Sequence, residues 1–318
     1  SDLKMVGVPL LKFTQITSTE MLGHHVYLGD QSEGNGIIYT TRGGFIDLGH
    51  VRDQADWTAF LFVQLQNVVP DSIYNLRLPF EGGVKMLTIK ADPELSQDDY
   101  IKLAGSMAYD LSVWHEIATW FGASSVPLVP ERYSSFSIED AYSNLLGVHI
   151  GMEAIVSDLP YEAAVSELLQ KELVEMGAVS STEATREAME SVHEIWWSRA
   201  RKLPTRKVLL ARELDVYEQV VPWLVPGREE FQLPHILEVP SLSNKGQNLH
   251  DYYAFTVRVN RKFPFRRMFP DREDRKITQR DFGLLMQRIK WELANKDRSK
   301  GEEKIKYSPA VDHVISGE

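Results

Sequence analysis

The residues best suited to chemistry lie in two short segments, 39–57 and 114–122, each of which combines His, a carboxylate and Trp. In the first segment His50, Asp53 and Trp57 are three and four residues apart, so on a helix they share one face. A His and a carboxylate at this spacing can both reach one metal ion. The same pair can equally be an imidazole whose tautomer is fixed by the carboxylate. The spacing alone does not decide between a metal site and a metal-free His–carboxylate pair.

The second segment carries His115 and Glu116 near the end of a predicted helix. The zinc-protease helix needs a second His four residues after the first, and Thr119 occupies that position. Adjacent helical residues also point about 100° apart, so this pair alone cannot hold one ion. Glu116 shares a face with Ser112 and Trp120, and burial beside Trp would raise its pKa. Glu116 is therefore predicted to be a general acid or base.

These side chains are predicted to converge in a cleft between the first two predicted helices. The expected catalytic residues are Glu116, His115, His50 and Asp53. If a divalent metal ion such as zinc takes part, the expected ligands are His50, Asp53 and His115. The residues expected to contact substrate are Arg42, Asp47, Arg52, Trp57, Trp120, Ser143 and Asn144. Asp140 is assigned to helix capping and packing, with the edge of the cleft as the alternative.

Several enzyme classes are disfavoured by what the sequence lacks. It contains no Cys, which excludes disulfides, zinc–thiolate sites, iron–sulfur clusters and thiol nucleophiles. It has no Gly-x-Ser-x-Gly elbow, no phosphate-binding Gly-Lys-Ser or Gly-Lys-Thr loop and no dinucleotide fingerprint. These absences argue against the α/β-hydrolase, P-loop and Rossmann classes. Any catalysis must use His, carboxylate, hydroxyl or Lys side chains.

Hydrophobic periodicity predicts the elements that position these residues. Ser96 and Asp99 form a capping box that opens a helix, and Gly122 ends it. Gly147 and Gly151 lie on one face of the next helix, which indicates close helix packing. The predicted helices cover residues 48–69, 96–121, 137–156, 161–177, 182–202 and 278–295. The predicted strands cover residues 26–28, 36–40, 84–89, 236–239 and 252–259.

This order of elements predicts an α+β fold in which a helix-dominant central layer carries short peripheral β-strands. Residues 1–203 are expected to form a main helical domain with N-terminal strands and the candidate site. Residues 204–298 are expected to pack on it as strands and a helix, within one continuous domain. Residues 299–318 are expected to form a flexible tail. A chain of 318 residues can bury a sizeable core.

The net charge of −10 is unevenly distributed, since residues 261–306 carry 15 Lys and Arg against 8 Asp and Glu. Phosphates or an anionic membrane surface would attract this segment, but its charges of both signs alternate, as on a solvated helix face. No nucleic-acid partner is therefore expected. No stretch approaches the roughly 18 apolar residues that a membrane helix needs. Position 1 is Ser, interpreted as a processed or engineered start, which leaves a secretion signal or lipid-anchored Cys upstream open.

Residues 39–53, 112–120 and 140–147 form three long blocks that resemble an uncharacterised bacterial cell-envelope family. That family is catalogued as a domain of unknown function, number 4056, and the resemblance extends over most of the chain. It implies a protein of the periplasm or outer cell envelope, with an upstream lipid anchor as an option. It implies no activity, so the site rests on the residues alone.

The residues and the resemblance together predict a cell-envelope hydrolase that acts on a glycan, a peptidoglycan fragment or a lipid headgroup. Catalysis would be by general acid and base, with metal assistance left open. Trp57 and Trp120 would form an apolar or sugar-stacking wall, and Arg42 would hold an anionic part of the substrate. The alternative is a non-catalytic binding or scaffold protein in which the same side chains form a buried structural network.

Overall fold

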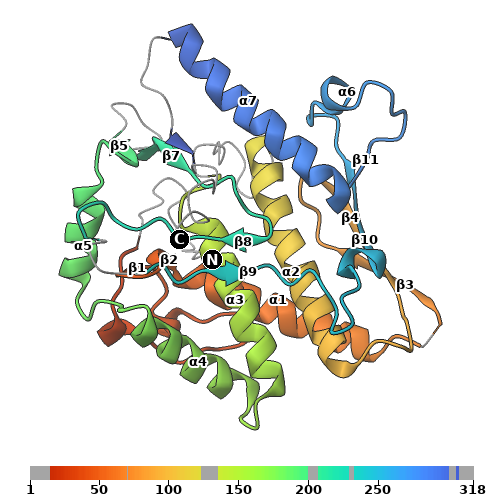
Figure 1. Ribbon diagram of the computed structural model, residues 1–318, viewed down its shortest axis with the longest axis horizontal. Coiled ribbons are helices and arrows are strands. Elements are labelled where there is room, and N and C mark those ends of the chain that lie inside the picture. Colours follow the sequence, from red (N-terminus) through yellow and green to blue (C-terminus); the bar gives the residue numbers. More distant parts are fainter. Residues whose placement is uncertain are drawn as a thin grey trace, which may run out of the picture.

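Three long helices build the centre of the molecule: α1 (Leu48–Gln66), α2 (Gln97–Trp120) and α3 (Asp140–Val156). In Figure 1 α2 runs through the middle of the molecule, and α1 and α3 pack against it and against each other. This structure is a computed structural model that describes residues 15–69, 71–122, 135–199, 207–228, 233–300 and 306–307. The helical centre with small peripheral sheets confirms the predicted α+β fold.

Side-chain caps explain where these helices begin and end. Ser96 Oγ accepts a hydrogen bond from Asp99 N at 3.2 Å, and Asp99 Oδ2 accepts one from Ser96 N at 3.0 Å. The predicted capping box of α2 is therefore confirmed. Just beyond the end of α2, Gly122 takes a φ of +90°, which a residue without a side chain adopts without strain. At α1, Asp47 Oδ1 accepts a hydrogen bond from Gly49 N at 2.8 Å.

Two glycines on α3 allow α1 to approach closely. A Cβ atom added at Gly147 would lie 2.1 Å from the carbonyl oxygen of Val51, and one at Gly151 would lie 2.9 Å from that of Ala55. A larger residue at Gly147 would force the two backbones apart. The predicted close packing is confirmed, and it brings the first turn of α1 against the first turns of α3.

A four-stranded antiparallel sheet packs on one side of α2. Its strand order is β11 (Lys276–Thr278), β10 (Tyr253–Val259), β4 (Gly83–Lys90) and β3 (Ile73–Leu78). The indole of Trp114 on α2 lies 6.4 Å from the ring of Phe255 on β10 and stacks on Phe282 at 6.0 Å, measured between ring centroids. Phe282 opens α7 (Phe282–Lys300). The sheet lies at the right margin of Figure 1, with α2 on its left.

Smaller elements surround this centre. β1 (Ile37–Thr40) and β2 (Gly44–Asp47) form an antiparallel hairpin directly before α1. α4 (Tyr161–Glu175) packs against α3. The other described helices and strands are α5 (Thr182–Ser191), α6 (Phe265–Met268), β5 (Trp197–Arg199), β6 (Lys207–Leu209), β7 (Ala211–Arg212), β8 (Gln219–Val220), β9 (Leu237–Glu238) and β12 (Lys306–Tyr307).

Two local predictions are wrong. Residues 26–28 contain a turn rather than a strand, with Leu28 at a φ of 69°. The helix predicted for residues 182–202 ends at Ser191, and Glu194 has a φ of 63°, which no α-helix accommodates. Trp196 beyond it packs against Phe45 and Trp223 in a second small core. Burial of these aromatic rings therefore overrides the helical pattern.

Apolar residues from both predicted parts of the chain, including Trp114 and Phe282, belong to one core cluster. Within the described ranges, no helix is both long and apolar enough to cross a bilayer. The predicted tail at residues 299–318 lies outside the described residues, apart from 299–300 and 306–307.

Candidate functional site

A small cavity lies between α2 and α3, and not between the first two predicted helices; half of its lining residues are polar, although most of the surface that it exposes is apolar. Its polar lining residues are Ser112, Glu116, Asp140, Asn144 and Glu213. Its other lining residues are Tyr109, Val113, Phe136, Ala141 and Val216. The open space of about 10 Å³ is close to the room that one water molecule needs. The structure thus brings together Glu116 and Asn144, two of the residues predicted from the sequence.

Glu116 is a buried carboxyl group with a raised proton affinity. The residue is 6% exposed, and its Oε2 accepts a hydrogen bond from Phe136 N at 2.5 Å. Burial and then the negative charge of Asp140 raise the pKa of Glu116 to about 7, although the positive charge of His115 opposes them. A carboxyl group with this pKa can both accept and donate a proton near neutral pH.

His50 lies on the first turn of α1 and faces the start of α3. Its Nδ1 is 3.3 Å from Asp140 Oδ1, while Asp140 Oδ2 accepts a hydrogen bond from Ser137 N at 3.0 Å. Burial lowers the pKa of His50, but Asp47 and Asp140 more than offset this and raise it to about 10. His50 is therefore an imidazolium cation at neutral pH, and its charge acts on the pKa of Glu116.

His115 supplies a second cation beside Glu116. Its Nδ1 lies 2.5 Å from Glu81 Oε1, and Lys85 Nζ donates to Glu81 Oε2 at 2.8 Å. Burial lowers the pKa of His115, but the hydrogen bond to Glu81 and the charge of Glu116 raise it to about 9. The His115 side chain is 43% exposed, so it borders solvent as well as Glu116.

Replacing His50 with Ala is expected to destabilise the protein most at low pH. The folded pKa of about 10 exceeds the ordinary value of 6.5, so the stabilisation is complete below pH 6.5 and disappears as pH rises through 10. We expect a loss of roughly 2 kcal/mol at acidic pH, below the figure for fully buried pairs because the His50 side chain is 26% exposed. Urea unfolding across this pH range measures the loss of unfolding free energy in His50→Ala, and His149→Ala is the control. A loss that does not change with pH would contradict the pairing.

Arg52 belongs to a separate buried network. Its Nη2 donates to the carbonyl oxygens of Gly23 at 2.8 Å and Glu33 at 3.0 Å, and its Nη1 lies 3.1 Å from Glu33 Oε1. His25 bridges Glu33 Oε1 at 3.0 Å and Asp56 Oδ1 at 2.9 Å. The side chains of Arg52 and Glu33 are only 2% and 1% exposed. This geometry ties the segment before β1 to α1.

Arg42 and Ser143 also make structural contacts. Arg42 lies in the β1–β2 turn and donates to the carbonyl oxygens of Leu233 at 3.1 Å and Glu175 at 3.3 Å. Ser143 is fully buried, and its Oγ accepts a hydrogen bond from Asp47 N at 2.9 Å. Ser143 therefore fixes the β2–α1 corner against α3, and so it positions Asp47 beside His50.

The remaining predicted residues do not line the cavity. Asp53 is exposed on α1. Trp57 is half-buried and makes an edge-on contact with Phe60, with ring centroids 5.7 Å apart. Trp120 is buried near the end of α2, where its Nε1 donates to Glu292 Oε2 at 3.3 Å. The structure does not bring Trp57 and Trp120 together as a wall of this cavity.

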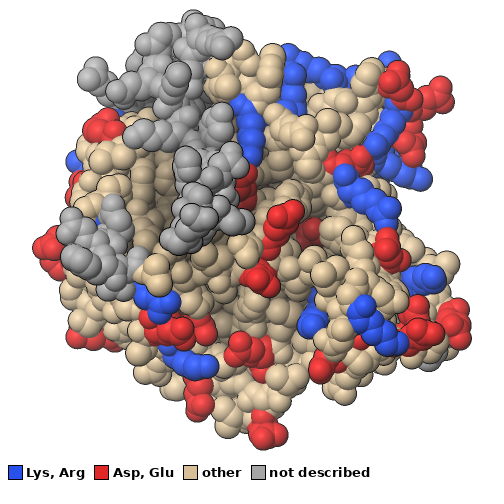
Figure 2. Space-filling view, viewed as in Figure 1, with Lys and Arg blue, Asp and Glu red and all other residues tan. Residues whose placement is uncertain are grey.

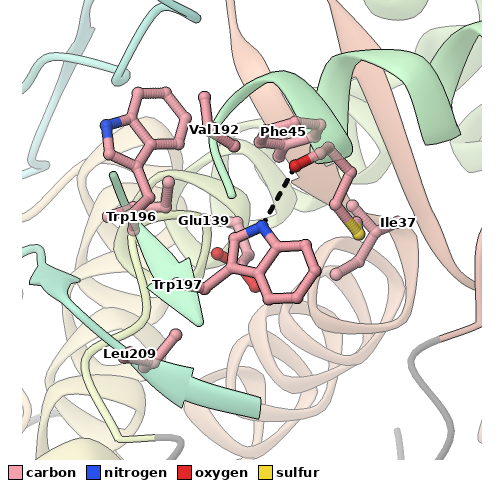
Figure 3. A pocket seen from close by; sticks show the side chains of 9 residues that line it. Ile37, Phe45, Glu139, Val192, Trp196, Trp197 and Leu209 are labelled. Carbon is pink, nitrogen blue, oxygen red and sulfur yellow. Dashed lines mark hydrogen bonds between the residues drawn. The ribbon is translucent and has the colours of Figure 1, made fainter. Parts of the chain in front are cut away.

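A second cavity lies on the other side of the segment that leads into α3. Glu139 lines this second cavity, whereas Asp140 lines the first. Figure 3 shows Trp196 and Trp197 around it, and Trp197 Nε1 donates to the carbonyl oxygen of Met189 at 3.0 Å. Its open space of about 20 Å³ admits roughly one water molecule, and its lining is largely apolar. We therefore assign it to packing.

The described residues contain no group of three or more His, Asp or Glu side chains arranged to hold one metal ion. His50 pairs with Asp140, His115 pairs with Glu81, and Asp53 is exposed on α1. The three predicted ligands do not form such a group. The His50 imidazole instead forms an ion pair with one carboxylate, that of Asp140.

Asp140, Glu81 and Lys85 complete the site beyond the predicted set. Asp140 was predicted to cap its helix, but α3 begins at Asp140 and has no side-chain cap. One Asp140 oxygen accepts a hydrogen bond from Ser137 N in the preceding turn, and the other faces His50. Glu81 and Lys85 flank the start of β4, and Glu81 is 34 residues from its partner His115. Nothing in the local sequence indicates that pairing, because the fold alone brings the two segments together.

Comparison with known proteins identifies the family. Residues 1–226 match the family model described as "Protein of unknown function (DUF4056)". The match spans α1, α2 and α3 and therefore the whole cavity. No curated protein and no solved structure matches the chain. The family predicted from the three sequence blocks is confirmed, and the chain belongs to the DUF4056 family of proteins of unknown function.

Proposed function

We propose that this protein is a hydrolase in which Glu116 exchanges a proton with a water molecule held in the cavity between α2 and α3. The observation that carries the proposal is the cavity itself. It has the size of about one water molecule and is lined by Glu116, Asp140 and Asn144. Next to it, His50 is a partly exposed cation held by Asp140. A base, a water position and an adjacent cation are the parts that hydrolysis requires.

In the proposed reaction the Glu116 carboxylate takes one proton from the water as the water oxygen bonds to the electrophilic centre of the substrate. The bond to the leaving oxygen then breaks, and that oxygen takes the proton from Glu116, which restores the carboxylate. The imidazolium of His50 stabilises the negative charge that develops on the substrate. Asp140 is a positioning residue, because it acts by holding His50.

The proposed substrates are a glycan, a peptidoglycan fragment or a lipid headgroup, at the periplasmic or outer cell envelope. The partly exposed cations His50 and His115 favour a substrate with a carboxylate or phosphate, and peptidoglycan fragments and phospholipid headgroups carry such groups. The envelope location follows from the family resemblance. The proposal assigns no role to Trp57 or Trp120 as a sugar-stacking wall.

A non-catalytic scaffold is the second candidate, and one observation favours it. Glu116 and Asp140 are each only 6% exposed, and each accepts a hydrogen bond from a backbone N–H, of Phe136 and Ser137 respectively. Buried carboxylates with such partners also fix how helices pack. If the protein is a scaffold, Glu116 and Asp140 fix the packing of the helices and the protein hydrolyses no substrate.

Incubation with purified peptidoglycan, a soluble glycan panel and phospholipid vesicles in heavy-oxygen water tests hydrolysis. The account predicts a product that contains one heavy oxygen atom from water. The rate should rise with pH as Glu116 loses its proton near pH 7, and fall as His50 loses its own near pH 10. A complete lack of products, or products without heavy oxygen, would favour the scaffold.

A further inference from the structure

The four-stranded sheet has an outer face that no described helix covers. Side chains alternate along each strand, so one set packs on α2 and the other points away from it. On β4, for example, Leu87 and Ile89 are buried, whereas Val84 and Lys90 are exposed. The residues of the outer set are Ile73, Asn75, Arg77, Val84, Met86, Thr88, Lys90, Ala254, Thr256, Arg258, Lys276 and Thr278. We refer to them as the outer sheet face.

The outer sheet face is positively charged in a protein whose net charge is −10. It contains Arg77, Lys90, Arg258 and Lys276 and no Asp or Glu. Strand pairing places Arg258 directly between Val84 and Lys276, so cations from different strands are neighbours. Lys276 Nζ also lies 4.0 Å from Asp274 Oδ2, a carboxylate just outside the strand, but four cations on one face of a sheet in an acidic protein do not follow from the overall composition.

The loop after β10 extends this charge. Arg261, Lys262, Arg266 and Arg267 are all exposed. Residues 271–275 follow with three Asp and Glu against two Arg, so this part of the loop lowers the local positive charge by one. Figure 2 shows Lys and Arg side chains gathered at the upper right, where α6 and β11 lie in Figure 1, with some Asp and Glu between them.

Apolar side chains are exposed on the same surface. Ile73 is 69% exposed and Val84 is 38% exposed on the outer sheet face. Phe80, at the tip of the β3–β4 hairpin, is 67% exposed. The tip is tied to the basic loop, because Asn260 N donates to Gly82 O at 3.0 Å. An exposed aromatic residue therefore lies in a hairpin whose backbone contacts the basic loop.

We propose that the outer sheet face and the adjoining hairpin and loop dock on an anionic phospholipid bilayer. Cations would lie against lipid phosphates, while Phe80 and Ile73 enter the interfacial region. One face of an antiparallel sheet can be exposed to solvent, and a bilayer can contact many side chains of such a face at once. An extended nucleic acid would leave Phe80 and Ile73 in water, so the bilayer is the favoured occupant.

Co-sedimentation with vesicles tests this docking without any need for turnover, so its result is separate from that of the proposed hydrolysis. The probes are vesicles of phosphatidylcholine mixed with phosphatidylglycerol, and vesicles of phosphatidylcholine alone. We expect binding to the anionic vesicles that high salt weakens. The triple change Arg77→Glu, Arg258→Glu and Lys276→Glu should lower the partition coefficient at least about a hundredfold.

A matched triple change makes the test specific. Lys171, Arg186 and Arg199 are exposed on α4, α5 and β5, at the lower and left side of Figure 1 away from the sheet, and their replacement by Glu alters the net charge equally. This control should retain most binding. The single change Phe80→Ser should weaken binding without altering charge, and circular dichroism checks that each variant folds. Equal binding to both vesicle types, equal losses in the two triple variants, or binding of RNA but not of vesicles would overturn the proposal.

Discussion

Replacing Glu116 with Gln is expected to lower turnover by about 10²- to 10⁴-fold while the protein stays folded. Gln has nearly the same shape, and its amide oxygen can still accept the hydrogen bond from Phe136 N that Glu116 accepts at 2.5 Å. The amide cannot take a proton from water, so only the proposed chemistry is removed. The assay is the heavy-oxygen incorporation described above, with Glu153→Gln as the control, because Glu153 is an exposed carboxylate on α3.

Although Glu116→Gln should lose turnover, it is expected to gain folding stability above pH 7. The pKa of Glu116 is raised from 4.5 to about 7, so wild-type stability from this group is complete below pH 4.5 and declines as pH rises through 7. Gln carries no charge at any pH, so Glu116→Gln should be more stable than the wild type above pH 7. Thermal unfolding at pH 5 and pH 8 compares the two. Full turnover by a folded variant would refute the assignment of Glu116 as acid and base.

Replacing Arg52 with Gln is expected to lower the free energy of unfolding by about 3–5 kcal/mol. The guanidinium is nearly fully buried, pairs with Glu33 at 3.1 Å and donates to two backbone carbonyl oxygens. Its removal leaves the Glu33 carboxylate with His25 as its remaining cation. The carbonyl oxygens of Gly23 and Glu33 both lose the Arg52 donor, and that of Glu33 keeps its hydrogen bond from Gly23 N at 3.0 Å. Breaking such a pair is strongly destabilising because a buried charge loses its compensation.

Urea unfolding measures this loss, and Arg186→Gln is the matched control. Arg186 is 53% exposed, and among the described residues its ion-pair partner is Glu183 on the same helix, so its change should alter stability by less than about 1 kcal/mol. The sequence alone assigned Arg52 to substrate contact. A variant that loses turnover but keeps its stability would restore that assignment, whereas a large loss of stability supports the structural one.

The parts of the fold that local chemistry determines could be predicted from the sequence. The Ser96–Asp99 capping box, Gly122 and the Gly147–Gly151 spacing act within one helix or one helix pair, so their effects are visible in the residues themselves. The end of α5 could not be predicted in this way. Packing of Trp196 against Phe45 and Trp223, which are far away in sequence, decides it.

In the candidate site, too, the sequence did not reveal contacts between residues that are far apart in the chain. Glu116 was recognisable because a carboxylate beside Trp on a buried helix face is unusual, and the structure places it in a small cavity with Asp140 and Asn144. The partner of His50 was expected at Asp53, one turn along the same helix, but the structure provides Asp140 from α3 at 3.3 Å. Helical spacing identifies residues that share a face, whereas a partner on another helix depends on how the helices pack.

The most direct test of the account is the pKa of Glu116. The carboxyl carbons of glutamate can be labelled and followed by NMR through a pH titration, and the signal that is missing from Glu116→Gln belongs to Glu116. The account predicts that this carboxyl titrates near pH 7 in the folded protein. A value near the ordinary 4.5 would contradict it, because burial and the negative charge of Asp140 would then not act on Glu116 as the account requires.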